Sequence, residues 1–178
     1  MKKIIVLALS LAMVAAMTAC SEPESKAPED FSFSLVWGIN GISSYDSATG
    51  QLVKTSDATH PEDYITHVQL DDGQADVFYH KLIEEMKAFD YPDKYDPYAK
   101  DEHNWTIMTE PNKDIELTVT CNGKTKTIRC EGVPLVSGTD YCPNKASRRF
   151  IETINEITDY FESTAEWGAL PEYEFFYE

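Results

Sequence analysis

The sequence predicts an α+β domain, with an antiparallel sheet of about five to six strands, including two hairpins, and two main helices packed on one face. Several short runs alternate apolar and polar residues, as half-buried strands do. Two longer stretches instead place apolar residues three and four positions apart, which is the spacing of one helix face. The resulting order, β-β-β-β-α-β-β-α, favours a two-layer antiparallel arrangement.

The first predicted strand occupies residues 31–37. Phe31, Phe33, Leu35 and Trp37 fall on one side of an extended chain, and the two intervening serines fall on the other. We therefore expect the aromatic side of this strand to face the core.

A hairpin is predicted next, formed by residues 42–45 and 51–55. Its loop starts at Asp46 and ends at Gly50, residue types that are favoured at the two ends of a turn. Residues 64–70 form a further β-rich run, which we expect to add a strand to the same sheet.

The first helix is predicted to begin after Asp71, because Gln74 stands three residues later and completes a capping box. Tyr91-Pro92 disfavours its continuation, so we expect the helix to end near residue 89. A polar loop at residues 90–104 follows. The apolar stripe that supports the helix comprises Ala75, Phe78, Leu82, Met86 and Phe89.

The second hairpin has the clearest local signal, the dipeptide Asn122-Gly123 between two alternating segments. A two-residue turn there pairs position 121 with 124, 117 with 128 and 115 with 130. Leu117 then faces Ile128 and Ile115 faces Cys130, so the apolar residues share one side of the hairpin.

A second helix is predicted from residue 145 to residue 161. Ser163 followed by Glu166 resembles another cap and predicts a short helix that holds Trp167. The aromatic end of the chain, residues 170–178, is expected to pack on the domain. The buried stripe of the second helix comprises Phe150, Ile151, Ile154, Ile157 and Phe161.

Residues 1–19 have the order of a secretory signal peptide. Two lysines precede an apolar run at residues 4–16, which is shorter than the ~20 residues that a transmembrane helix requires. Met17-Thr18-Ala19-Cys20 then resembles the lipobox of bacterial lipoproteins, although Met17 replaces the commonest leucine. The resemblance implies cleavage before Cys20 and lipidation of its sulfur. An uncleaved anchor, or cleavage elsewhere, is the alternative interpretation.

The lipid, with acyl chains such as palmitate, would hold the exported protein at the outer face of the cytoplasmic membrane. Residues 20–30 are predicted to be the lipid anchor and a disordered tether, and residues 31–178 a single domain. Residues 1–19 contain two basic and no acidic residues, so their removal changes the formal charge from −16 to −18. This charge argues against nucleic acid and anionic headgroups as partners.

The body of the chain also carries a resemblance. Residues 41–55, Gly-Ile-Ser-Ser-Tyr-Asp-Ser-Ala-Thr-Gly-Gln-Leu-Val-Lys-Thr, and residues 164–173, Thr-Ala-Glu-Trp-Gly-Ala-Leu-Pro-Glu-Tyr, are similar to segments of uncharacterised Gram-positive, clostridia-type lipoproteins. The resemblance implies export and an α+β fold, and it supplies no catalytic residue.

Three cysteines remain besides Cys20, an odd number for an exported protein. The predicted hairpin separates Cys121 from Cys130 by roughly 20 Å along the strands, whereas a disulfide requires Cα atoms within about 7 Å. Cys130 and Cys142 are therefore the candidate disulfide, and three reduced thiols are an equal alternative.

Clustered carboxylates in the loop at 90–104 make a weak candidate for calcium binding, because hard cations prefer several oxygen ligands. A solvated acidic loop is the more ordinary interpretation. The candidate ligands are Asp90, Asp93, Asp96, Asp101 and Glu102.

Aromatic residues in and beside the same loop could bind a sugar or a protein, although packing within the domain is the more common role of such residues. The candidate surface comprises Tyr91, Tyr95, Tyr98 and Trp105.

No residue pattern indicates catalysis. The sequence lacks a Gly-x-Ser-x-Gly elbow, a His-Glu-x-x-His helix and a glycine-rich phosphate loop. We therefore expect a non-enzymatic module that binds an envelope protein or glycan, with a small cell-envelope hydrolase as the alternative.

Overall fold

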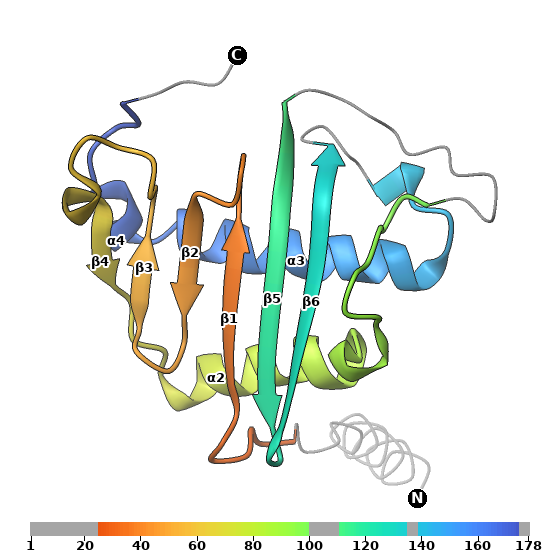
Figure 1. The fold of residues 1–178 in the computed structure, drawn as a ribbon. Coiled ribbons are helices and arrows are strands. Elements are labelled where there is room, and N and C mark those ends of the chain that lie inside the picture. The colour runs from red at the N-terminus through yellow and green to blue at the C-terminus, as the bar shows by residue number, and fades with distance from the viewer. Residues whose placement is uncertain (1–24, 100–110, 135–138, 175–178) are drawn as a thin grey trace, which may run out of the picture.

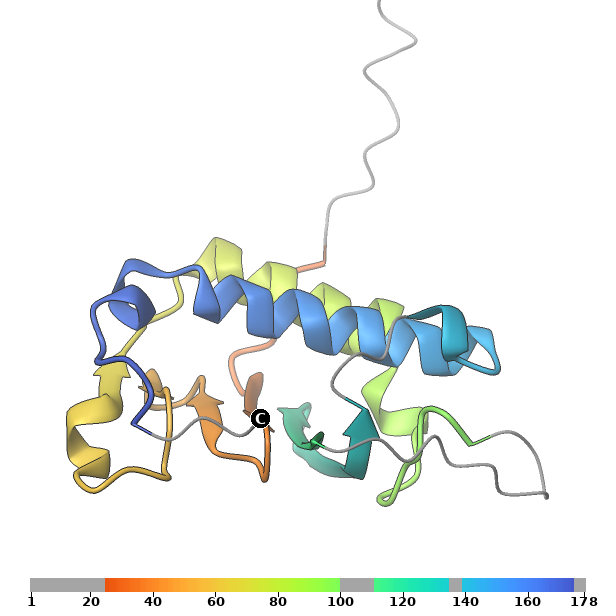
Figure 2. The same ribbon diagram turned by 90° about the horizontal axis from the view of Figure 1, so that it is seen from above.

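A computed structural model describes residues 25–99, 111–134 and 139–174 of the chain. Their six strands form one antiparallel sheet in the order β4-β3-β2-β1-β5-β6, and the main helices cover one face of it (Figures 1 and 2). The predicted α+β class is confirmed. The strands are β1 Ser32–Trp37, β2 Ser43–Asp46, β3 Gln51–Val53, β4 Ile65–His67, β5 Asn112–Cys121 and β6 Lys124–Pro134.

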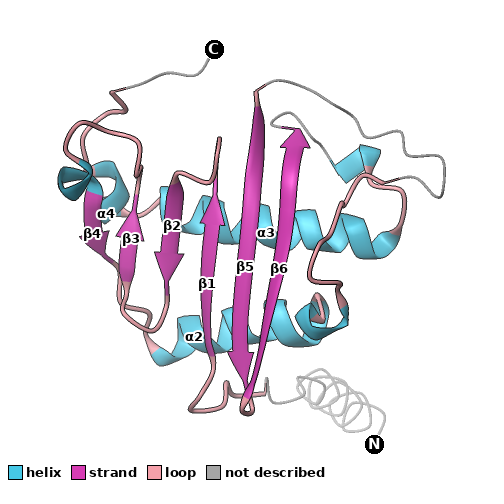
Figure 3. Cartoon of the chain, viewed as in Figure 1, coloured by secondary structure: helices cyan, strands magenta, loops and turns pink. Residues whose placement is uncertain are grey.

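Helical segments connect and cover these strands (Figure 3). The two long ones are α2, which continues into the π-helical η2, and α3. The helical segments are η1 Pro61–Tyr64, α2 Asp72–Tyr79, η2 His80–Glu85, η3 Ala88–Asp90, η5 Thr139–Tyr141, α3 Lys145–Glu162 and α4 Ala165–Gly168.

The β5–β6 hairpin has the predicted register. Position 121 pairs with 124, 117 with 128 and 115 with 130, and a bulge interrupts the ladder between Lys113 and Ile115. Asn122 and Gly123 both have positive φ, 52° and 70°, as the tight turn that suits a twisted hairpin requires.

The core lies between the sheet and the helices. β1 buries Phe33, Leu35 and Trp37, as its alternation predicts. The Tyr45 ring of β2 stacks on Phe161 of α3 with centroids 3.8 Å apart. All five predicted stripe residues of α3 are buried, and the helix begins at residue 145 as expected.

Several element boundaries differ from the sequence-based predictions, and β3 for example ends at Val53 and not at residue 55. The strand expected at 64–70 is only Ile65–His67, because its partner β3 offers just three residues. The first helix ends before the expected residue 89, since Lys87 has a left-handed backbone. Thr164, and not Ser163, caps the last short helix by accepting a hydrogen bond from Trp167 N at 3.2 Å.

The C-terminal segment packs on the domain as far as it is described. The Tyr64 hydroxyl donates to Glu172 O at 2.9 Å, and Thr59 N donates to a Glu174 carboxylate oxygen at 2.8 Å. The Lys54 ammonium lies 5.7 Å from the Trp167 ring centroid and 5.3 Å from that of Tyr173. These cation–π contacts join the end of the chain to the β3 region.

Residues 25–30 are the described part of the segment predicted to be a disordered tether, and they contact the folded domain. Ala27 N donates to an Asp76 carboxylate oxygen of α2 at 2.8 Å. The Asp30 carboxylate accepts from Asn122 N at 3.0 Å and from Gly123 N at 2.6 Å. The described part of the tether is therefore bound to α2 and to the β5–β6 turn.

Candidate functional site

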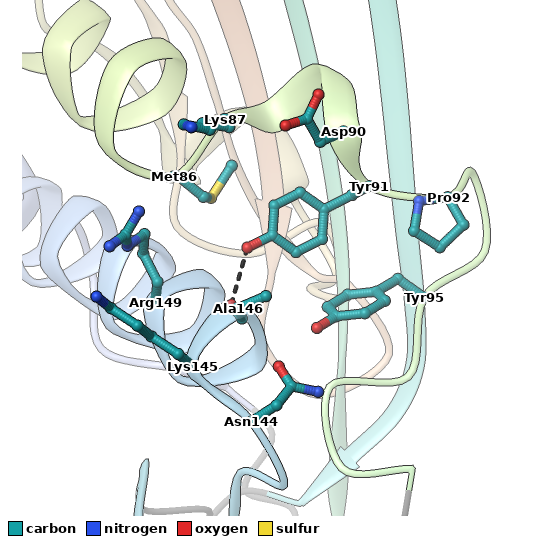
Figure 4. A pocket seen from close by; sticks show the side chains of 10 residues that line it. All are labelled: Met86, Lys87, Asp90, Tyr91, Pro92, Tyr95, Asn144, Lys145, Ala146 and Arg149. Atoms are coloured by element: carbon teal, nitrogen blue, oxygen red, sulfur yellow. Dashed lines mark hydrogen bonds between the residues drawn. The ribbon is translucent and has the colours of Figure 1, made fainter. Parts of the chain in front are cut away.

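A pocket lies between the segment that follows η2 and the first turn of α3 (Figure 4). Its volume is about 550 Å³. Small-molecule sites commonly have volumes of this order. Its lining residues are Met86, Lys87, Asp90, Tyr91, Pro92, Tyr95, Asn144, Lys145, Ala146 and Arg149.

Two tyrosines fasten the loop wall of this pocket to α3. The Tyr91 hydroxyl donates to Ala146 O at 2.8 Å, and the Tyr95 hydroxyl lies 2.9 Å from Ser147 Oγ. The same loop is pinned to the edge strand β6, because Tyr95 N donates to Arg129 O at 2.8 Å. The wall is thus held from both sides.

The aromatic part of the wall rests on the core. The rings of Tyr91 and Tyr95 meet edge to face with centroids 5.0 Å apart, and both contact Phe150 of α3. Burial, with a smaller contribution from Tyr95, raises the pKa of Tyr91 to about 12. The Tyr91 hydroxyl therefore stays neutral at physiological pH and serves as a hydrogen-bond donor.

Lys87, Lys145 and Arg149 supply positive charge to the pocket, and their side chains lie together on the side opposite Pro92 and Tyr95 (Figure 4). None of the three forms an ion pair with a described residue. Arg149 donates to Glu85 O, a carbonyl at the end of η2, which orients its guanidinium.

The start of α3 adds backbone donors to the same side. Asn144 caps the helix by accepting from Ser147 N at 2.9 Å. No described group accepts a hydrogen bond from Lys145 N or Ala146 N, as is usual in the first turn of a helix. The arrangement can therefore hold an anionic group beside an aromatic wall.

The lining residues that the structure describes include no serine, cysteine or histidine, and so no such nucleophile paired with a base. Tyr91 is held neutral, and Asp90 is the single carboxylate of the described lining. The chemistry that this pocket offers is charge recognition and ring contact, which serve binding.

The predicted calcium ligands do not converge as far as they are described. Asp93 pairs with Lys126 of β6, and Asp96 accepts from Tyr98 N at 2.9 Å. Asp90 lines the pocket. The described residues contain no group of three or more metal-binding side chains. Asp101 and Glu102 lie outside the described residues, so weak calcium binding stays a prediction.

The residues of the predicted aromatic surface do not all lie in one place in the structure. Tyr91 and Tyr95 line the pocket, although Tyr91 is only 7% exposed. Tyr98 is 2% exposed and belongs to the core, so its assignment to an exposed surface was wrong. Its ring is part of the hydrophobic core, although the polar composition of the loop had suggested an exposed position. Trp105 lies outside the described residues.

The three downstream cysteines are free thiols in the structure, and the Cys130–Cys142 bond is not formed in it. Burial raises the pKa of Cys130 to about 12, with a smaller contribution from Asp96. Burial also raises the pKa values of Cys121 and Cys142. None is thereby activated as a nucleophile. Cys20 lies outside the described residues.

Sequence reasoning missed the three cations of the pocket. Lys145 and Arg149 lie one helical turn apart, and with Arg148 they form a basic cluster in a strongly acidic chain. That local reversal of charge was the available signal. Lys87 gave none, because its proximity to α3 depends on the packing of η2 against that helix.

Two smaller hollows lie on the sheet face opposite the helices. One, of about 210 Å³, is bordered by Glu116 and Arg129, whose side chains pair at 2.7 Å. The other, of about 110 Å³, is bordered by Ser34 and Thr118. Both are smaller than the pocket lined by Tyr91, Tyr95, Lys87, Lys145 and Arg149, which we call the tyrosine–cation pocket.

Within the described residues, no helix has the length and apolar character needed to cross a membrane. No family model, no curated protein and no solved structure matches the chain.

Proposed function

We propose that the protein is a lipid-anchored, non-enzymatic binding module at the outer face of the cytoplasmic membrane, and that the tyrosine–cation pocket is its ligand site. Lipidation of Cys20 would hold it there. The observation that supports this function best is the pocket itself. Its volume of about 550 Å³ suits a small molecule or one end of an envelope glycan.

The hydrogen bonds that hold the loop wall of the pocket in place support the proposal. The loop wall is fixed by hydrogen bonds from Tyr91 to α3 and from Tyr95 to both α3 and β6. A site whose walls are already in place loses little conformational entropy when a ligand binds. The pocket is thus suited to recognition without a large rearrangement.

A cell-envelope hydrolase remains the alternative function, and the described pocket favours it less. Hydrolysis requires a nucleophile or an activated water beside a base of suitable pKa. Asp90 is the one described lining carboxylate, and it would have to act without a partner acid or base among the described lining residues.

A pocket-filling substitution tests the proposal. Ala146→Phe would place a ring in the pocket from the exposed first turn of α3. The full-length protein in detergent would be mixed with a small-molecule extract of the cell envelope and examined by native mass spectrometry. We expect adducts on the unaltered protein and their loss in Ala146→Phe.

Ala169→Phe is the matched control, because it adds the same ring at an exposed alanine outside the pocket. It should retain the adducts. Equal adducts on both variants would place the ligand elsewhere and contradict the proposed site. The absence of adducts on the unaltered protein would contradict a small-molecule function.

A further inference from the structure

We propose that the tyrosine–cation pocket takes a small organic phosphate, with the phosphate on Lys87, Lys145 and Arg149 and a sugar or aromatic ring against the tyrosine wall. This inference rests on the proposed function and specifies its ligand. The geometry that leads to it is the meeting, in one pocket, of two tyrosines with three cations that form no ion pair with a described residue.

The pocket is locally positive although the whole chain carries a formal charge of −16. Its described lining contains three cations and one carboxylate. At physiological ionic strength, charges more than ~8–10 Å from a solvent-exposed site are largely screened. An anion in the pocket is therefore governed mainly by the lining residues and only weakly by the distant carboxylates.

The cations occupy positions that are unfavourable in the absence of an anion. Lys145 is the first residue of α3, and its first turn contains no acidic residue. A helix N-terminus carries a partial positive charge, so a lysine there opposes the helix dipole. Arg149 lies one turn further along the same wall. A bound anion would relieve the repulsion between Lys145 and the helix dipole.

The backbone conformation of Lys87 is an independent indication that the pocket binds an anion. Its backbone is left-handed, with φ 62° and ψ 58°, at the position after a helix where glycine is the usual residue. A lysine at such a position destabilises the fold relative to glycine. Its ammonium nevertheless contributes to the pocket. The strain is explained if the charge of Lys87 is used for binding.

A phosphate matches this set of donors better than a carboxylate does. A phosphate monoester carries close to two negative charges at neutral pH and has three terminal acceptor oxygens. Two ammonium groups, a guanidinium and the free amides of Lys145 and Ala146 could satisfy all three oxygens. Asp90 would disfavour a second anionic group near Tyr91, which selects a ligand with a single phosphate and an uncharged ring.

The strongly negative net charge of the chain excludes long polyanions as ligands. A nucleic acid strand would extend beyond the pocket over a surface whose net charge is strongly negative. A ligand small enough to lie within the pocket avoids that repulsion. The inference is therefore limited to small phosphates.

The experiment compares matched probes on the full-length protein in detergent by titration calorimetry. The probes are glucose 1-phosphate, glucose and glucuronate, together with phenyl phosphate and phenol. We expect at least one phosphorylated probe to bind, and its neutral partner and the carboxylate to bind at least about tenfold more weakly, since hydrogen bonds to charged groups are the stronger ones. Binding should also weaken as salt is added.

Three variants locate the phosphate. Lys145→Gln and Lys87→Gly should each weaken binding of the phosphorylated probe about tenfold, as expected for loss of a charge-assisted contact. Arg148→Gln, an exposed cation adjacent to the pocket residue Arg149 and outside the lining, should leave binding unchanged. Because Lys87→Gly removes backbone strain, its effect on binding cannot be attributed to unfolding.

Two results would overturn the inference. Equal binding of a phosphorylated probe and its neutral partner would show that the phosphate is not recognised. Absence of binding by every probe would do the same. Neither result bears on the proposed function, which depends on the adducts lost in Ala146→Phe.

Discussion

Lys87 shows how one residue links the stability of this fold to its pocket. It adopts φ 62°, and non-glycine residues pay about 1–2 kcal/mol for that left-handed conformation. The π-helical η2 ends at Glu85, and the chain turns at Lys87 into η3 and then Tyr91. The left-handed residue therefore both ends the helix and directs the loop toward the pocket.

We predict that Lys87→Gly raises the free energy of unfolding by about 0.5–1 kcal/mol, because relief of the left-handed strain exceeds the entropy that glycine adds to the unfolded chain. Urea denaturation would measure the change. Lys87→Ala is the control, since it removes the same charge and retains Cβ. A similar gain in Lys87→Ala would mean that charge, and not backbone strain, limits stability at this position.

At the scale of elements, the local sequence pattern was sufficient to predict the structure wherever neighbouring residues determine both the turn and the buried face. The register of β5 and β6 followed from Asn122-Gly123 and the alternation on either side of it. The bounds of α3 followed from its stripe and the residues that flank it. In these two elements, the same short segments specify conformation and burial.

The pocket could be predicted only in part, because it depends on contacts between distant segments. Tyr91 and Tyr95 stood out as loop aromatics, whereas their fastening to Ala146 and Ser147 needed the position of α3. The short β4 had a similar cause, since the length of an edge strand is limited by its neighbour β3. Residue composition does not contain that information.

The N-terminal segment and the β5–β6 turn form one unit through Asp30. Backbone N–H groups of Gly123 and Asn122 hold the pKa of the Asp30 carboxyl below its ordinary value of 3.8. A depressed folded-state pKa means that the contribution to stability is present above the unfolded pKa. It is lost as the pH falls through the lower, folded pKa.

We predict that Asp30→Asn lowers the melting temperature at pH 7, and that the difference from the unaltered protein shrinks as the pH falls below about 4. Thermal melts across pH 2–7 would measure it. Glu29→Gln is the matched control, an adjacent exposed carboxylate without a hydrogen bond to the turn. A pH-independent difference for Asp30→Asn would show that the charge of Asp30 is not what stabilises the turn.

At the scale of the whole molecule, the bound segment shortens the connection to the proposed lipid. Ser25 is the first described residue, so four residues separate Cys20 from the described structure. The five Cα–Cα steps from Cys20 to Ser25 span at most about 18 Å when the chain is fully extended. A lipid on Cys20 would therefore hold the domain close to the membrane, with the end that carries Asp30 and the β5–β6 turn nearest to it.

The domain itself would contribute little attraction to that surface. With residues 1–19 removed, the formal charge is −18, which anionic headgroups repel. We therefore predict that Cys20→Ser moves the protein from the membrane fraction to the soluble fraction, because the acyl chains supply nearly all of the attachment. Fractionation of cells followed by immunoblotting would measure the distribution, and a high-salt wash should not release the unaltered protein.

Cys142→Ser is the matched control for this experiment, since it removes a partly exposed thiol from the folded domain and leaves the proposed lipidation site intact. It should remain in the membrane fraction. Retention of Cys20→Ser in membranes would mean that an uncleaved leader or a bound partner holds the protein. The short connection would then no longer determine which end of the domain faces the membrane.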